Sequence, residues 1–174
     1  SVKTDRIDSR KMAEYFLNGQ LTKVHVPSLA EEMDRGLVRS RKFVGRQLSK
    51  LKLHILSICR RVAINYREAE QDQKKHYWTK QHREWLQGKV KEQENHELSF
   101  NMTQLLKQIE QFEETIKMYD EEIARKAEQK NYKEKVASLC SYRGIDVLTA
   151  MTLVTELGDI KRFSHPRQLC SYAG

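Results

Sequence analysis

Two aspartates near the start of the chain, Asp5 and Asp8, have the type and spacing that could bind a metal ion. On the first turn of a helix, residues three apart face the same way. Neighbouring carboxylates repel each other unless a cation lies between them, and Mg²⁺ or Mn²⁺ takes such oxygen ligands. The alternative is that both favour the positive end of a helix and pair with nearby cations, namely Lys3, Arg6 or Arg10. Spacing alone favours this alternative.

A basic stretch, RSRKFVGRQLSKLK, is the second candidate site. Its cations could follow the phosphates of a nucleic acid, and they could equally form a solvated helix face. They are Arg39, Arg41, Lys42, Arg46, Lys50 and Lys52. Further candidate nucleic-acid contacts are Lys3 and Arg6 near the start, and Arg143 and Arg162 beside expected turns.

The stretch HYWTKQHREWL holds both tryptophans and could stack bases or cover phosphates through Lys80, His82 and Arg83. We favour the alternative that Trp78 and Trp85 anchor a helix pair. The six histidines form no ligand cluster, and His82 is expected to be solvated. The three cysteines form no CxxC pair, which argues against a zinc site and against a disulfide framework.

Composition predicts long helices and a polyanionic partner. Of 174 residues, 32% are charged and 8% aromatic, with seven glycines and two prolines to interrupt helices. The net charge is +8, and residues 1–90 carry 20 Lys and Arg against 10 Asp and Glu. The basic surface is therefore expected in the first half of the chain. No apolar stretch is long enough to span a bilayer, so no membrane partner is expected.

Two heptad patterns dominate the middle of the chain. A short helix capped by Asp8 or Ser9 and an extended segment ending at Pro27 come first. A long helix over 28–70 then begins with a capping box of Ser28 and Glu31. Its apolar seam, broken only at Arg41, consists of Leu37, Val44, Leu48, Leu51, Ile55, Ile58 and Val62. A shorter helix over 73–90 separates it from a second seam, formed by Leu98, Met102, Leu105, Ile109, Phe112, Ile116, Tyr119 and Ile123.

The two seams predict either an antiparallel helical hairpin or a coiled coil between chains, and the pattern does not choose between them. Because a thin hairpin encloses no globular core, we expect association to supply much of its stability. After residue 133 the pattern predicts a helix, a turn at 143–145, a helix over 147–157, a turn at 158–159 and a short helix. Such a helical pair resembles a helix-hairpin-helix element, although Asp146 argues against phosphate binding at its turn.

Two motifs resemble a known family. The stretch KTDRIDSRKMAEYFLNGQL, followed by VHVP, resembles the end of the RuvC-like domain in the Asp-Glu-Asp-Asp insertion-sequence transposases. This family, often called the IS-one-ten family, includes the Piv-type DNA invertases. The stretch GIDVLTAMTLVTELGDIKRFSHPRQLCSYAG is similar to the C-terminal transposase domain of the same proteins. The resemblance implies a RuvC-like edge at 1–27, a basic coiled-coil region at 28–132 and the start of a transposase domain at 133–174.

The resemblance also implies a function. Asp5 and Asp8 match the last two acids of the family's Mg²⁺- or Mn²⁺-binding tetrad, so they would be catalytic in DNA strand cleavage and joining. Ser164 and Ser171 do not match the family's nucleophilic serine. The implied partners are DNA, a structured bridge RNA and further copies of the chain, in a bacterial or archaeal cytoplasm. We expect the chain to be an internal fragment that is inactive alone. The competing hypothesis is a non-catalytic coiled-coil module that binds nucleic acid.

Overall fold

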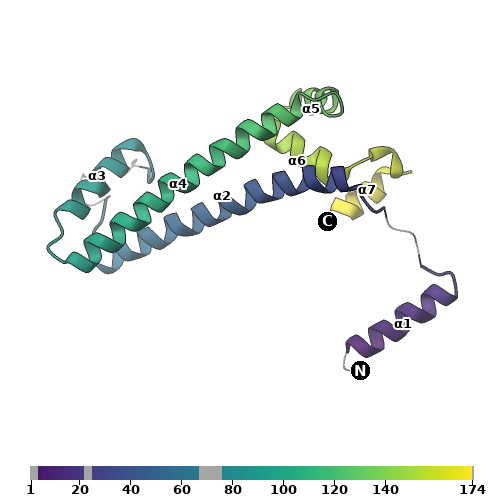
Figure 1. The fold of residues 1–174 in the computed structure, drawn as a ribbon, viewed down its shortest axis with the longest axis horizontal. Coiled ribbons are helices and arrows are strands. Elements are labelled where there is room, and N and C mark those ends of the chain that lie inside the picture. Colours follow the sequence, from purple (N-terminus) through teal and green to yellow (C-terminus); the bar gives the residue numbers. More distant parts are fainter. Residues whose placement is uncertain (1–3, 22–24, 67–75, 174) are drawn as a thin grey trace.

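The computed structural model describes residues 4–21, 25–66 and 76–173, and within these ranges the chain is helical and has no strand (Figure 1). This confirms the predicted mainly α fold. The helices are α1 (Asp5–Leu17), α2 (Leu29–Arg61), α3 (Lys80–Lys91), α4 (His96–Ala127), α5 (Lys133–Cys140), α6 (Val147–Leu157), the 3-10 helix η1 (Ile160–Arg162) and α7 (Pro166–Ala173).

The long helices α2 and α4 lie side by side and run in opposite directions (Figure 1). Three ion pairs fix their register: Asp34 with Lys126, Arg41 with Asp120, and Lys52 with Glu113. From one pair to the next, the residue number on α2 increases while the residue number on α4 decreases, as an antiparallel pair requires. Of the two arrangements that the sequence left open, the structure therefore contains the hairpin within one chain.

The contact between these helices is built largely from the predicted seams. Leu48, Ile55 and Ile58 are buried on α2, and Met102, Ile109 and Ile123 are buried on α4. Arg41, the predicted break, directs its guanidinium to Asp120 at the edge of the contact.

The limits of the α2 seam differ from the prediction. Val62 is 40% exposed because α2 ends at Arg61, well short of residue 70. Ala63 follows with a φ of 55°, which takes the chain out of the helical path. At the other end Val38 is 1% exposed, although the heptad pattern placed it beside the seam.

Each end of the hairpin is completed by shorter helices. At one end α3 adds Leu86 and Val90 to a core cluster with Ile55, Met102 and Ile109. At the other end, Ala150 and Met151 of α6 and Val136 of α5 pack on Val38 and on Ile123 and Ala127. The hairpin thus has two separate cores, one at each end.

The local signals for helix ends are mostly confirmed. Ser28 and Glu31 form the predicted capping box, in which the Ser28 N–H donates to Glu31 Oε2 at 2.8 Å and the Glu31 N–H donates to Ser28 Oγ at 3.3 Å. The predicted helix over 147–157 is α6, and the turn before it contains Gly144 with a φ of 91°. Gly158, with a φ of 64°, ends α6, and α7 is the short helix expected after it.

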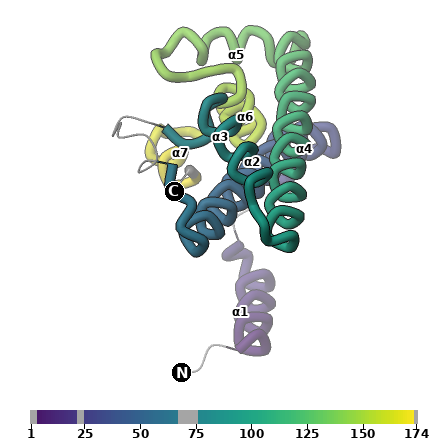
Figure 2. The backbone as a smooth tube through the Cα atoms, turned by 90° about the vertical axis from the view of Figure 1, so that its left-hand side faces the viewer, coloured from purple at the N-terminus to yellow at the C-terminus, as the bar shows by residue number. Residues whose placement is uncertain are grey.

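The first helix departs from the prediction. It begins at Asp5, with Thr4 in the N-cap position, so neither Asp8 nor Ser9 caps it. Its apolar side chains, including Met12, Phe16 and Leu17, are exposed, and α1 lies apart from the other helices (Figures 1 and 2). Of the extended segment predicted at 21–27, residues 22–24 lie outside the described ranges; the rest has no regular structure.

Among the described helices, none combines the length and the apolar character that crossing a bilayer would require.

The first testable prediction concerns the core at the α3 end. Replacing Ile55, which is fully buried, by alanine should lower the free energy of unfolding by about 2–5 kcal/mol, because the change removes packed methyl groups and leaves a cavity. His54→Ala, the neighbouring residue on the same helix and exposed, is the control and should change it by less than about 0.5 kcal/mol. Urea unfolding measures both. Equal losses would contradict this core.

Candidate functional site

The two aspartates stand in the first turn of α1. Thr4 precedes the helix and makes no side-chain hydrogen bond to it. The acidic residues of the first turn are Asp5 and Asp8. Their spacing puts both carboxylates on one side of the helix. Asp5 is exposed and Asp8 is half-buried. The structure is therefore compatible with a pair of oxygen ligands on one helix, and equally with two acids that stabilise a helix start.

The described residues supply at most part of a metal site. No group of three His, Cys, Asp or Glu side chains in ranges 4–21, 25–66 and 76–173 could hold a metal ion together. Mg²⁺ is nevertheless often held by one or two carboxylates, with waters and substrate phosphates as its other ligands. Asp5 and Asp8 fit that smaller contribution.

Three cations of the basic stretch bind carboxylates of the protein itself. Arg39 forms two hydrogen bonds with Glu156 of α6, at 2.8 and 2.7 Å, and these hold the pKa of Glu156 below its ordinary value. Arg41 also forms two hydrogen bonds, with Asp120 of α4, at 2.8 and 3.0 Å. Lys52 contacts Glu113 at 2.9 Å. These contacts largely neutralise the charge of the three cations. We therefore infer that their main role is to hold the helices together.

Three other cations of the stretch remain available. Lys42, Arg46 and Lys50 are exposed and form no hydrogen bond or ion pair with the described residues. They recur every four positions on α2, so they follow one face of the helix. Within the predicted stretch, this face is the part best suited to phosphates.

The remaining predicted contacts are scattered over the structure. Arg6 is exposed on α1, and Arg143 is exposed in the turn between α5 and α6. Lys3 lies outside the described residues. The structure does not bring these residues together with the α2 face.

Arg162 has an unusual environment. Its guanidinium carbon lies 4.4 Å from the ring centroid of Phe163 and 4.5 Å from that of Tyr172. Such stacking stabilises a cation. Its Nε is buried and has no hydrogen-bond partner among the described residues. Arg162 thus helps to fix α7 beside η1 through these rings.

The turn before α6 is not prepared for phosphate. Asp146 caps the helix by accepting a hydrogen bond from the Thr149 N–H at 2.8 Å, and this contact lowers the pKa of the Asp146 carboxyl. A carboxylate therefore already occupies the positive end of α6. This agrees with the objection that the sequence raised against phosphate binding here.

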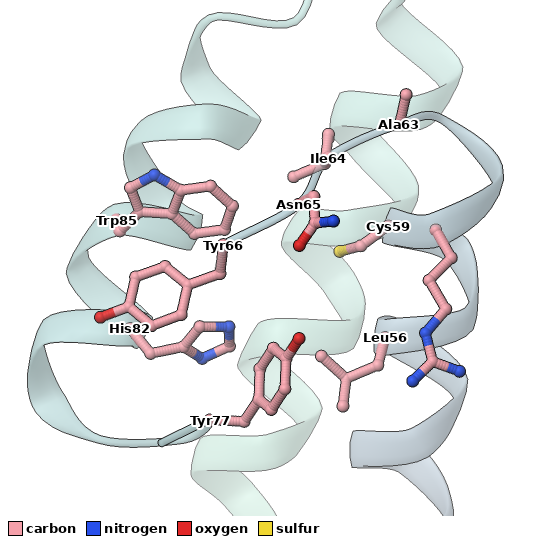
Figure 3. Close-up of a pocket in the computed structure, with 10 residues that line it drawn as sticks. Leu56, Cys59, Ala63, Ile64, Asn65, Tyr66, Tyr77, His82 and Trp85 are labelled. Atoms are coloured by element: carbon pink, nitrogen blue, oxygen red, sulfur yellow. The ribbon is translucent and has the colours of Figure 1, made fainter. Parts of the chain in front are cut away.

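His82 is buried, 1% exposed, and the expectation that it is solvated was wrong. The Trp78 N–H donates to its Nδ1 at 3.1 Å, and its ring contacts those of Tyr66 and Tyr77 (Figure 3). Burial lowers its pKa. The density of aromatic residues around it was the signal in the sequence.

Arg83 and Trp78 also have structural roles. Arg83 donates two hydrogen bonds to Glu113, at 2.6 and 2.7 Å, so this carboxylate is shared with Lys52 and its pKa is lowered. Lys52 lies 5.5 Å from the Trp78 ring centroid. Trp78 and Trp85 pack against the core cluster at this end, which supports their role as packing anchors.

Comparison with known proteins points to one family. Residues 136–174 match the family model of the IS116/IS110/IS902 transposases. The whole chain is similar to curated transposases. It is 30% identical, over 173 residues, to the predicted transposase y4qE of Sinorhizobium fredii. It is 29% identical, over 167 residues, to the transposase for insertion sequence element IS1533 of Leptospira borgpetersenii.

Both relatives are described as transposases, and this chain aligns with part of each. The alignments cover 99% and 95% of this chain, but only 39% of y4qE and 46% of the IS1533 transposase. The chain therefore spans less than half the length of the curated relatives it matches. No solved structure is significantly similar to it.

The burial of His82 leads to a pH prediction. Its pKa is lower in the folded state than the ordinary value of 6.5, so the unfolded chain binds a proton that the folded chain does not. This contribution to stability is complete above pH 6.5 and is lost as the pH falls towards the folded pKa. The loss is at most about 1.4 kcal/mol per pH unit for one proton. Urea unfolding between pH 8 and pH 5 should show a smaller decline for His82→Gln; equal declines would contradict the prediction.

Proposed function

We propose that this chain is part of an insertion-sequence transposase that cleaves and joins DNA strands. The observation that carries the proposal is the similarity to transposases along nearly the entire chain. The family match at 136–174 supports it, because in that region α5 and α6 pack together on the hairpin, and α7 is linked to α6 by the hydrogen bond that the Tyr172 hydroxyl donates to the Glu156 carbonyl. The order of elements also suits the proposal, since α1 with its two aspartates precedes the hairpin.

Asp5 and Asp8 are proposed to be two ligands of a Mg²⁺ or Mn²⁺ site at the edge of a RuvC-like domain of the whole protein. Their place on one side of an exposed helix supports this assignment. The other ligands would come from parts of the protein outside this chain. When bound, the metal would activate the attacking oxygen and stabilise the leaving oxygen at a phosphodiester. The part of Asp5 and Asp8 is to hold that ion at the exposed start of α1.

The proposed nucleic-acid contacts on α2 are Lys42, Arg46 and Lys50, because these cations are exposed and form no ion pair with the described residues. A structured guide RNA from the mobile element is a proposed second partner. Association of several copies through the hairpin is also proposed, and the exposed apolar side chains of Phe43, Leu53 and Met118 support it.

The competing function is a non-catalytic module that binds nucleic acid. It is favoured by one observation, namely that the described residues contain no complete metal site. In that case Asp5 and Asp8 would only stabilise the start of α1.

Substitution of the aspartates separates the two functions. In the full reading frame that contains this chain, expressed with the non-coding DNA of its element, Asp5→Asn and Asp8→Asn should each reduce joining of donor and target DNA by at least about a hundredfold, because the neutral amide binds a divalent cation far more weakly. Joining is measured by counting junctions in cells.

Glu14→Gln is the matched control, since Glu14 is an exposed acid on the same helix that pairs with Arg10. It should leave joining unchanged. If both aspartate variants join DNA normally, the catalytic assignment is wrong. Deleting the non-coding DNA, with the protein intact, tests the guide RNA: unimpaired joining would exclude a guide encoded there.

The α2 face makes a separate prediction. Replacing Lys42, Arg46 and Lys50 together by glutamine should weaken binding to duplex DNA and reduce the slope of log affinity against log salt concentration by up to about 3, since each phosphate contact contributes about 0.9. A control with the same charge change replaces Lys107, Lys130 and Lys135, which are exposed elsewhere. Fluorescence anisotropy at several salt concentrations measures both slopes. Equal slopes would show that the α2 face is merely solvated.

A further inference from the structure

A pocket lies at the end of the hairpin where α2 ends and α3 begins (Figure 3). Its volume is about 570 Å³. This falls in the range of about 300–1,000 Å³ that is usual for small-molecule sites. Tyr66, Tyr77, His82 and Trp85 line it from the α3 side, and Leu56 and Cys59 line it from α2. The pocket is thus far larger than a packing defect between two helices.

The aromatic wall is continuous. The Tyr66 ring centroid lies 4.7 Å from that of His82 and 4.9 Å from that of Trp85, and Tyr77 lies 5.2 Å from His82. Tyr66 and Tyr77 both meet the imidazole at steep angles, 72° and 88°. Tyr66 and His82 are buried, at 2% and 1% exposure, so they hold the wall in place, and the rings with surface open to a flat, aromatic ligand are those of the half-buried Tyr77 and Trp85.

The wall also contains a polar group with a defined proton. His82 Nδ1 accepts the hydrogen bond from the Trp78 N–H, so in the neutral imidazole the proton is on Nε2. Burial lowers the pKa of His82 and keeps this neutral form. The imidazole is therefore fixed as a hydrogen-bond donor at Nε2.

The edge of the pocket is positively charged. Arg60, in the last turn of α2, lines the pocket and is exposed, and it forms no ion pair with the described residues. Arg61 is exposed beside it but does not line the pocket. A ligand that places an aromatic ring in the pocket and an anionic group at its edge would satisfy both features.

Backbone strain gathers at the same place. Among the described residues, only Ala63 and Trp78 have a positive φ without being glycine, at 55° and 69°. Ala63 lines the pocket, and Trp78 follows Tyr77. Strained conformations of this kind persist where the surroundings enforce them, and they cluster at ligand sites. The strain is a second observation, independent of the rings, that sets this end of the hairpin apart.

We propose that this pocket binds an unpaired base of a single-stranded nucleic acid, RNA or DNA, with Arg60 on an adjacent phosphate. The proposal rests on the proposed function in that the protein acts on nucleic acid. Base stacking on aromatic side chains tolerates any base, so the pocket would recognise the absence of pairing and not a sequence. It would direct a single-stranded segment to the end of the hairpin opposite α6.

Intrinsic fluorescence tests the proposal directly, because the two tryptophans of the chain both belong to this cluster. The 174-residue chain is titrated with oligouridylate, with oligothymidylate and with an abasic sugar-phosphate oligomer of the same length. We expect the base-bearing oligomers to quench the fluorescence and the abasic oligomer to do so at least tenfold more weakly. Tighter binding of oligouridylate assigns the site to RNA, and tighter binding of oligothymidylate assigns it to DNA.

Two matched pairs of variants locate the site. Arg60→Ala should weaken binding about tenfold, and Arg61→Ala, with the same charge change, should not. Tyr77→Leu should weaken binding about tenfold because the ring is lost, whereas Tyr77→Phe keeps the ring and should bind as tightly as the unchanged chain. Circular dichroism melting confirms that each variant is folded, and the exposed Arg60 gives a test that does not depend on the core.

The proposal is overturned if the abasic oligomer quenches equally, if Arg60→Ala and Arg61→Ala behave alike, or if no oligomer quenches. This outcome is independent of the proposed function, which is measured by DNA joining in the Asp5 and Asp8 variants. If the full protein joins DNA but no oligomer quenches the fluorescence of the chain, only the proposal about the pocket is refuted.

Discussion

The structure depends on one geometrical constraint: two long helices packed against each other share only one face. The α2–α4 contact can bury single rows such as Leu48, Ile55 and Ile109, but it cannot enclose a core. Additional helices therefore complete the burial at each end, α3 on one side and α5 with α6 on the other. The middle of the hairpin remains thin, and the features suited to binding lie along its surface and at its ends.

Because the hairpin is thin, many of its charged side chains lie at the edges of the α2–α4 contact. Carboxylates at the edges of the contact attract cations from the facing helix, so Asp120 takes Arg41, and Glu113 is shared between Lys52 and Arg83. Asp34 accepts from Tyr132 at 2.5 Å and pairs with Lys126 at 2.7 Å, which joins three segments of the chain. A net charge of +8 therefore overstates the charge available to a polyanion. The available cations are those without such a partner, above all along Lys42, Arg46 and Lys50.

What the sequence predicted well depends on local periodicity. The two seams, the Ser28 capping box and α6 follow from spacings within a few turns of helix. Several of the errors arise where distant segments meet. Val38 is buried because α6 covers it, and Arg39 binds Glu156, 117 positions away. His82 is buried by rings from both sides of its own helix start, and no periodic pattern records such a cluster. For the basic stretch on α2, the sequence identified the cations, but it did not show which of them are left without a carboxylate partner.

The hairpin fixes the distance between its two ends. Over its 33 residues α2 extends for about 50 Å, at 1.5 Å per residue. Near its start, Arg39 binds Glu156 and Arg35 donates to the Thr155 carbonyl, so α6 is held to the helix by several charged contacts. At its other end Ile58 and Cys59 are packed in the core that supports the aromatic pocket. Both ends are thus attached to one continuous helix, with the Lys42, Arg46 and Lys50 face between them. A nucleic acid with a base in the proposed pocket and its backbone along α2 would therefore meet these three cations.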